Sequence, residues 1–422
     1  MVPGLHLTAT SKQPPHVEPF TLVPEDSPTV WYGGELDPKE LEYHLTKDDL
    51  QELEETIKKV DAARIKLEDV TKEQFPLPKL GPKLKAIHDD LLFGRGIRVL
   101  KGLPLGPPHS QRHAAVTIWL LSEYFGKQQP LTASGHLIGH VKYDDGRLKR
   151  TSNLSQVPLG YHADNSDIVF LACRSQAKTG GKSSCVSSHA LHNEILKRRP
   201  DLHKVLGTLF FQDRGDWWPA GTPPYYVSPF FHYHAGTLGV QEVRPNLDDA
   251  AKLSPHVPKP TAIQKEALAF VQEVAREERL RFDYQLTSGD LLLNHNITTF
   301  HSRGTWEDGE TEEEKRHMLR IWIASPNGWP LEPAYAERWV TTEIGKRGGL
   351  SCPGTRPHIA IEFEEYLADQ QQWLRDYGSF ATTDYLKGPS PAPTISLPVQ
   401  ENGEPFKLEG KLHQSVAVKA AA

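Results

Sequence analysis

The chain has 422 residues, of which 38% are hydrophobic and 24% charged, a composition typical of folded globular proteins. Its formal net charge of -6 argues against a nucleic-acid partner, because such a partner requires a basic protein face. The sequence has no apolar run of membrane-spanning length, and residues 1–20 lack the apolar segment of a secretory signal, so we expect a cytoplasmic protein with no membrane partner.

The N-terminal part of the chain predicts an extended arm followed by helices. Residues 1–30 are rich in Pro and Thr and show no periodicity, which favours an arm without regular structure. A helix is predicted from Thr46 to Val60, since Thr46 can cap its first turn and the stripe Leu50, Leu53 and Ile57 gives it an apolar face. The next segments are predicted as a helix at Pro82–Leu92, a strand within residues 94–104 and a helix at residues 111–126 that ends at Gly126.

Residues from Tyr161 to about Ser325 favour strands. Short β-rich runs occur at residues 168–173, 205–211 and 282–286, separated by Gly, Pro and Asp turns. One helix is predicted among them, from Thr261 to Glu278, with Thr261 and Gln264 as a capping box. Its apolar face is predicted to contain Ile263, Ala267, Leu268, Val271 and Val274. Many short strands with few helices predict a mainly β fold with flanking helices, an α+β arrangement of jelly-roll type.

The chain is expected to form one large domain. We assign residues 1–30 to the arm, residues 31–387 to the domain, and residues 388–422, which are Pro-rich and then polar, to a disordered tail. Within the domain we expect a helical N-terminal part, a jelly-roll core at about residues 90–340 and a C-terminal helical elaboration.

One candidate metal-binding pair lies directly before an apolar run. His162 and Asp164 are two residues apart in the segment GYHADNSDIVFLAC. If they lie on a strand, residues i and i+2 point to the same side, and an imidazole and a carboxylate can reach one ion. The alternative is a surface His and Asp at the entrance of a strand.

A second segment supplies a histidine and two arginines. The run GDLLLNHNITTFHSR contains His295 and His301, and a later predicted strand carries Arg316 and Arg320. Two histidines and one carboxylate with open coordination positions form the facial triad of non-haem iron oxygenases. A guanidinium is a natural partner for a dicarboxylate, because its planar fork pairs both oxygens of a carboxylate. His295 is a rival third ligand, since its even offset from His301 would keep both on one side of a straight strand.

The sequence resembles the taurine dioxygenase (TauD/TfdA) family, specifically its largely fungal branch. The resemblance spans roughly residues 90–340 and rests on four stretches that match in order: YHADNSDIVFLAC, AKTGGKSSCVSSHALHNEILKRRPDL, GDLLLNHNITTFHSR and KRHMLRIWIASPNGWPL. It implies a double-stranded β-helix, the cupin-like jelly roll. It also implies iron(II), 2-oxoglutarate as cosubstrate, and O₂.

The resemblance implies a role for several individual residues. His162, Asp164 and His301 match the three iron ligands, because the family's third ligand falls directly before the Ser-Arg pair that follows His301. Arg316 matches the arginine that pairs with the far carboxylate of 2-oxoglutarate. Ser183 falls where the family has a Gly-Gly-x-Thr hydroxyl beside that same carboxylate, and serine keeps the donor.

Three residues are candidates for contact with the substrate. Arg320 matches a second arginine that faces substrate or cosubstrate in relatives. Asn165 replaces an apolar residue of the taurine-specific members, which argues against taurine or a simple sulfonate as substrate. His295, once His301 is taken as the ligand, is expected to make hydrogen bonds near the metal. His317 should point away from the site by strand alternation.

The reaction that the resemblance implies is oxidation of an unactivated C–H bond in a small polar substrate, an amino acid or a related carboxylate. Succinate and CO₂ would be released, and no catalytic side chain is expected beyond the metal centre. Hydroxylation is the default outcome, with aziridine-type oxidative cyclisation or desaturation of an amino acid as alternatives. A catalytically silent iron and 2-oxoglutarate binding protein is a further alternative. A metal-dependent hydrolase has no need of the clamp predicted at Arg316. The sequence is compatible with a homo-oligomer.

Overall fold

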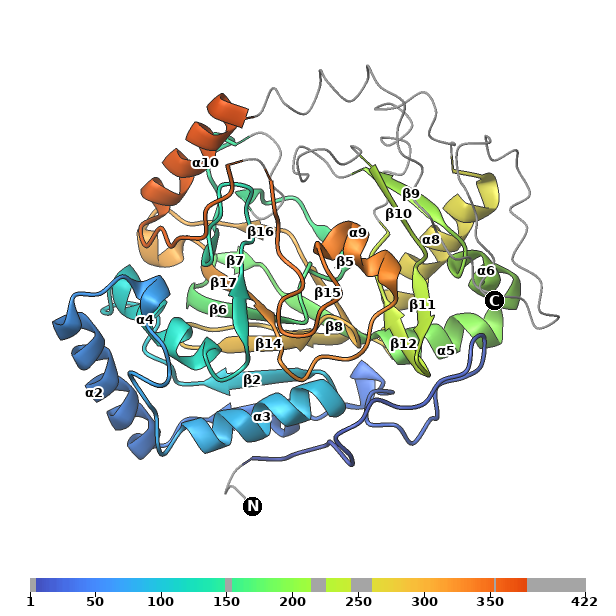
Figure 1. The fold of residues 1–422 in the computed structure, drawn as a ribbon, viewed down its shortest axis with the longest axis horizontal. Coiled ribbons are helices and arrows are strands. Elements are labelled where there is room, and N and C mark those ends of the chain that lie inside the picture. Colours follow the sequence, from blue (N-terminus) through green and yellow to red (C-terminus); the bar gives the residue numbers. More distant parts are fainter. Residues whose placement is uncertain (1–4, 149–153, 214–224, 244–259, 353, 378–422) are drawn as a thin grey trace.

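The computed structural model describes residues 5–148, 154–213, 225–243, 260–352 and 354–377 (Figure 1). Two β-sheets pack face to face at its centre, and helices cover their outer faces. This is the predicted α+β jelly roll. The predicted tail, residues 388–422, lies outside the described residues.

The larger sheet contains seven strands. β1 pairs in parallel with β2, the other pairs are antiparallel, and β4 joins through β17. Its main path runs in the order β1 (Glu42–His44), β2 (Ile97–Lys101), β14 (Leu291–His295), β6 (Ile168–Ser175), β17 (His317–Ala324) and β3 (Lys127–Gln129), with β4 (Gly139–Val141) beside β17.

The smaller sheet contains four antiparallel strands. Their order is β13 (Phe282–Tyr284), β8 (Ser183–Ser187), β15 (Thr299–Arg303) and β5 (Leu159–His162). Side chains from both sheets, including Val99, Leu292 and Met318 of the larger and Cys185 and Phe282 of the smaller, form one buried core between them. Three further pairs are β7 (Thr179–Gly180) with β16 (Trp306–Glu307), β9 (Phe210–Asp213) with β10 (Tyr225–Ser228), and β11 (Phe231–His234) with β12 (Thr237–Val240).

Helices bury the outer faces of both sheets (Figure 1). The helices α2 (Lys47–Ala63), α3 (Gly81–Phe93) and α4 (Gln111–Ser122) cover the larger sheet. The helices α5 (Ser188–Arg198), α6 (Pro200–Leu206) and α8 (Ala262–Ala275) cover the smaller one. The other α-helices among the described residues are α1 (Pro38–Leu41), α9 (Ala336–Trp339) and α10 (Phe363–Tyr377).

The helix starts were predicted well because local side chains determine them. Thr46 caps α2 with Asp49 as its capping-box partner, and Thr261 and Gln264 do the same for α8. The helix ends were predicted less well: α4 ends at Ser122 instead of Gly126, and α8 ends at Ala275 instead of Glu278.

Three predictions in the β-rich region were wrong. α8 is not the only helix among the described residues of that region, because α5 and α6 lie between β8 and β9. Residues 205 and 206, predicted as strand, end α6, where Leu202 and Leu206 are buried against α8. Ile263 is 43% exposed, so it does not belong to the buried face of α8.

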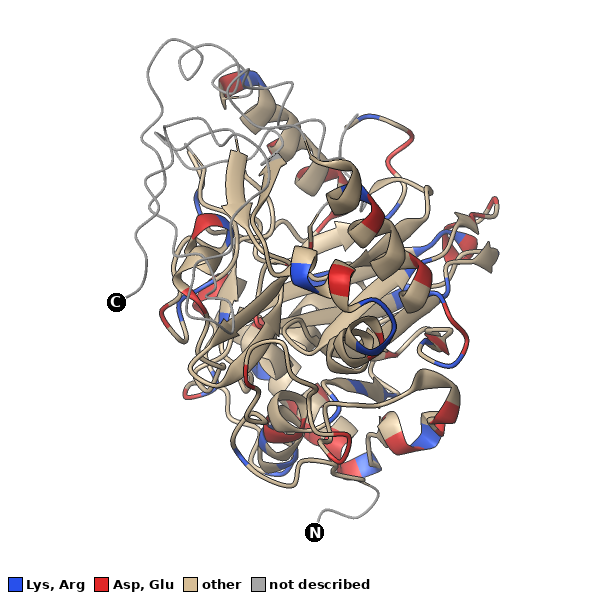
Figure 2. Ribbon diagram, turned by 90° about the vertical axis from the view of Figure 1, so that its right-hand side faces the viewer, with Lys and Arg blue, Asp and Glu red and all other residues tan. Residues whose placement is uncertain are grey.

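The surface carries both signs of charge. In Figure 2, blue and red residues alternate along the outer helices and loops, while the central strands are mostly tan. Among the described residues, the chain offers no helix of the length and apolar character needed to cross a bilayer.

Candidate active site

The three predicted ligands meet where the two sheets are connected. His162 ends β5, and His301 lies directly opposite it on the neighbouring strand β15. Asp164 lies in the connection that leaves β5 in the smaller sheet and enters β6 in the larger one. The assumption that His162 and Asp164 share a strand was therefore wrong, because this connection, and not strand alternation, turns Asp164 toward the two histidines.

The geometry of this cluster suits a transition-metal ion. One ligand atom from each of the three residues lies within 4.8 Å of the others, and the His162 and His301 ring centroids are 4.3 Å apart. The His301 Nε2 is 3.7 Å from the Asp164 Oδ2. The His162 Nδ1 donates a hydrogen bond to the Gly160 carbonyl at 2.8 Å, which leaves Nε2 as the atom available for coordination. Two nitrogens and one carboxylate oxygen fit the donor set of a facial triad.

The protonation states of the cluster also suit a cation. Burial opposes ionisation of Asp164, but the nearby Arg320, together with His301 and His162, outweighs it and lowers the pKa of Asp164 to about 2. Burial and the neighbouring His162 lower the pKa of His301 to about 3. At neutral pH the cluster thus offers a carboxylate and a neutral His301 ring, the forms that bind metals.

Asn296 holds the backbone of Asp164 in place, a role that was not predicted from the sequence. Its Oδ1 accepts a hydrogen bond from the Asp164 N–H at 3.2 Å, and its Nδ2 donates to the Ser166 carbonyl at 2.8 Å. Asn296 follows β14 and so ties the β14–β15 turn to the connection that carries Asp164. The residue lies 132 positions from Asp164, and only the fold brings the two together.

Replacing Asn296 with Ala should weaken iron binding by about 10–100-fold, the range found when partners that orient metal ligands are lost. The three candidate ligands remain in Asn296→Ala, but the Asp164 backbone is no longer held. Equilibrium dialysis against iron(II) under anaerobic conditions measures the change, with exposed Asn327→Ala as the control. Equal iron affinity in both variants would show that Asp164 is oriented without this contact.

A buried cationic cluster contains Arg303 on β15 and Arg316, which directly precedes β17. Arg316 is 1% exposed, and the guanidiniums of Arg303 and Arg316 lie 4.2 and 5.0 Å from the ring centre of Trp306. Burial lowers the pKa of Arg316 to about 10, and burial together with the charges of Arg316 and Arg320 lowers the pKa of Arg303 to about 9. Such shifts arise where positive charges share a shielded space.

The glycine-rich run predicted beside Arg316 is adjacent to it in the structure. Gly181 has a φ of +71°, and a Cβ at this position would lie 3.2 Å from the Arg316 Nε, so glycine leaves room for the guanidinium. Ser183 begins β8, is 5% exposed, and is paired in register with Arg303 on β15. The Nε and Nη1 of Arg316 are buried and have no hydrogen-bond acceptor among the described residues. A carboxylate of 2-oxoglutarate has two oxygens that can accept hydrogen bonds from these two nitrogens.

Arg303 was missed from the sequence, although strand alternation could have identified it. It lies two residues after His301 on β15, so the two side chains emerge on the same face. Arg320 reaches the metal cluster itself, where its Nη1 lies 3.3 Å from both carboxylate oxygens of Asp164. His317 points away as expected, and its Nε2 contacts the His140 Nδ1 at 2.8 Å.

Two predicted substrate residues have other partners in the structure. The Asn165 Nδ2 donates to the carbonyls of Arg338 and Gly349, at 3.0 and 2.5 Å, and so ties the segment that contains α9 to the connection that carries Asp164. His295 ends β14 in the other sheet, where its Nδ1 contacts the Thr298 Oγ1 and its ring lies against Trp329. The structure does not bring His295 to the cluster, because the chain turns from one sheet to the other between His295 and His301.

A pair of opposite charges beside the cluster was not predicted. Arg338 on α9 lies within 3.5 Å of the Ala163 carbonyl, between the two predicted ligands of the His-x-Asp segment, and forms a 3.1 Å ion pair with Glu242. Both side chains are largely buried. The sequence separation of 96 residues left no local signal that would have identified the pair.

A family model described as "Taurine catabolism dioxygenase TauD, TfdA family" matches residues 61–322, well over half of the chain. The chain belongs to this family. It is therefore a 2-oxoglutarate-dependent non-haem iron dioxygenase that uses iron(II), 2-oxoglutarate and O₂.

Two curated relatives and one solved structure are similar to this chain. FR-33289 synthase from Streptomyces rubellomurinus is 28% identical over 71% of this chain and 90% of that protein. The taurine hydroxylase-like protein SAT17 from Stachybotrys chartarum is 27% identical over 73% of this chain and 82% of that protein. An asparagine oxygenase, solved with iron(II), hydroxyasparagine and succinate, matches with a TM-score of 0.51 at 17% identity, over 67% of this chain and 93% of that one. Its similarity confirms the jelly-roll fold.

Proposed function

We propose that this dioxygenase oxidises a C–H bond of a small amino acid, with His162, Asp164 and His301 as the iron ligands. We further propose that Arg316 and Ser183 bind the far carboxylate of 2-oxoglutarate. The observation that carries this proposal is the buried Arg316 guanidinium. Its Nε and Nη1 have no acceptor among the described residues, and it shares the Trp306 ring with Arg303, which lies on the same strand as His301. A dicarboxylate would supply the missing anion, and we expect its other end to bind the metal.

Each residue has a separate task in this proposal. Iron(II), 2-oxoglutarate and O₂ would together supply the oxidant: one atom of O₂ would enter 2-oxoglutarate as it becomes succinate and CO₂, and the other would be available to oxidise the C–H bond. Arg316 orients the cosubstrate by a two-pronged, charge-assisted contact. Asp164 stays ionised because Arg320 faces it, and Arg320 also presents positive charge toward the space beside the metal.

The proposal that the substrate is an amino acid rests on the charges beside the His162, Asp164 and His301 cluster. An amino acid carries a carboxylate and an ammonium, and the pair Arg338 and Glu242 offers the complementary charges next to Ala163. Arg320 is a second cation for the substrate carboxylate. The asparagine oxygenase with the same fold, by its name, acts on an amino acid, which supports this class.

The test is a screen of small amino acids and related carboxylates, read by succinate formation and product mass. A substrate is expected to raise succinate formation above the level without it. Gain of one oxygen atom identifies hydroxylation, the proposed outcome, whereas loss of two hydrogens identifies cyclisation or desaturation. If no amino acid raises succinate formation but a carboxylate without an ammonium group does, the amino-acid assignment is wrong.

Variants of the charge pair test the substrate site separately from the cosubstrate site. Glu242→Gln should raise the KM for the amino acid by about tenfold or more, the effect of losing one charged hydrogen bond. The apparent constant for 2-oxoglutarate should stay near wild type, because Glu242 is not part of the Arg316 pocket. A KM that is unchanged in Glu242→Gln would remove this residue from the substrate site.

A further inference from the structure

A second cluster of two histidines and a carboxylate lies away from the iron site. His136 lies in the loop between β3 and β4, His358 lies in the segment before α10, and Asp369 lies on α10. Their ligand atoms are also within 4.8 Å of one another. His136 is fully buried, whereas Asp369 is 40% exposed, so solvent ions can reach the cluster.

The hydrogen bonds of His358 fix its tautomer. Its Nδ1 lies 2.8 Å from the Arg356 carbonyl, and a carbonyl only accepts, so Nδ1 carries the hydrogen. In the neutral ring, Nε2 then bears a lone pair. That lone pair faces the Asp369 Oδ2 at 3.0 Å, and an ionised carboxylate is also only an acceptor. Two acceptors at this distance repel each other unless a proton or a metal ion lies between them.

His136 is directed at the same oxygen. Its Nε2 lies 3.3 Å from the Asp369 Oδ2, and its Nδ1 contacts the hydroxyls of Thr132 and Ser134 at 2.9 and 3.0 Å. Histidines that bind metals typically have their second nitrogen anchored in this way. A tetrahedral ion with bonds of about 2.0–2.1 Å holds its ligand atoms about 3.3 Å apart, which matches the 3.0 and 3.3 Å separations here.

We propose that His136, His358 and Asp369 bind a divalent zinc ion that joins the β3–β4 loop, the segment before α10 and α10 itself. Two imidazoles and a carboxylate without a thiolate suit zinc, and water fills the fourth position. The backbone already aligns two of these segments, since the Leu137 N–H donates to the His358 carbonyl and the His358 N–H to the Gly135 carbonyl. The zinc ion would additionally link these two segments to α10 through Asp369.

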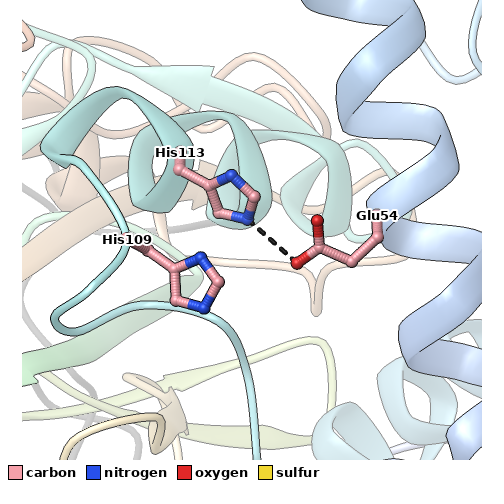
Figure 3. A group of neighbouring side chains, drawn as sticks. All are labelled: Glu54, His109 and His113. Carbon is pink, nitrogen blue, oxygen red and sulfur yellow. Dashed lines mark hydrogen bonds and ion pairs between the residues drawn. The ribbon is translucent and has the colours of Figure 1, made fainter.

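A third cluster of the same composition provides a matched comparison. Figure 3 shows His113 pointing from α4 toward Glu54 on α2, with His109 beside it. The His113 Nε2 is 3.1 Å from the Glu54 Oε1, and the two imidazoles are stacked with centroids 4.5 Å apart. Within the described part of the chain, neither Nδ1 has a hydrogen-bond partner that would fix its tautomer. We therefore expect weaker zinc binding there.

The test is equilibrium dialysis of the full chain against zinc alone, in a His162→Ala/His301→Ala background that removes the iron site. This background should bind one zinc ion. Adding His358→Ala or Asp369→Asn should remove it, and adding His113→Ala should not. Far-UV circular dichroism verifies that each variant is folded, and the partly exposed Asp369→Asn serves if the His358 change prevents folding.

Hydrogen exchange gives a second readout that does not depend on enzyme activity. Zinc should slow amide exchange in α10 of the background protein and leave exchange unchanged in the Asp369→Asn variant. The proposal is overturned if the background binds no zinc, if zinc binding persists in Asp369→Asn, or if His113→Ala alone abolishes it. Because the iron site is absent throughout, these outcomes are independent of the proposed oxygenase function.

Discussion

His301→Ala should lose iron binding and succinate formation, whereas His295→Ala should keep most of both. His301 faces His162 across two paired strands and lies 3.7 Å from the Asp164 carboxylate. Loss of a direct ligand should weaken iron binding by more than about 100-fold, since even loss of an orienting partner costs about 10–100-fold. Iron content after anaerobic reconstitution, followed by succinate formation, measures both effects.

His295→Ala is the matched control for this prediction. His295 is fully buried against Trp329, so its loss should lower the melting temperature by leaving a cavity and an unpaired Thr298 hydroxyl. Iron affinity of the folded protein should stay close to wild type. If His295→Ala loses iron and His301→Ala retains it, the assignment of the third ligand is wrong.

Arg316→Ala should weaken the binding of 2-oxoglutarate by about tenfold to a hundredfold or more while leaving iron binding nearly intact. A charge-assisted contact in a shielded site contributes about 1.5–3 kcal/mol. Arg316 meets this condition, because it is 1% exposed and stacks on Trp306. The apparent constant for 2-oxoglutarate, from succinate formation, measures the loss.

Two further variants separate the arginines. Arg316→Lys should not restore the constant fully, because an ammonium lacks the planar fork. Arg320→Ala should have a smaller effect on 2-oxoglutarate, since Arg320 faces Asp164. An unchanged constant in Arg316→Ala with a large rise in Arg320→Ala would move the clamp to Arg320.

The sequence predicted those features that depend on local patterns. Thr46 and Thr261 cap the helices that follow them, because a cap needs only neighbouring residues. The His-x-Asp pair and His301 were identified as candidate ligands for the same reason: each lies in a distinctive short motif. The geometry that unites them was predicted incorrectly, since Asp164 lies in a connection between sheets and not on a strand.

The residues that were missed act over long sequence separations. Asn296 reaches Asp164, and Arg338 reaches Glu242, only because the fold joins distant segments. His295 shows the opposite error: it was predicted near the metal from the local sequence, but it lies elsewhere in the fold. A straight strand through His295 and His301 would have kept them together, but the chain changes sheets in the three residues between β14 and β15.

The measurement that tests the central claim most directly is conversion of 2-oxoglutarate to succinate by the wild-type chain and by Asp164→Ala, each with and without iron(II) and O₂. We expect the wild type to form succinate only when both iron(II) and O₂ are present. We expect folded Asp164→Ala to retain little iron and to form no succinate. Equal iron content and equal succinate formation in the two proteins would contradict the assignment of this site.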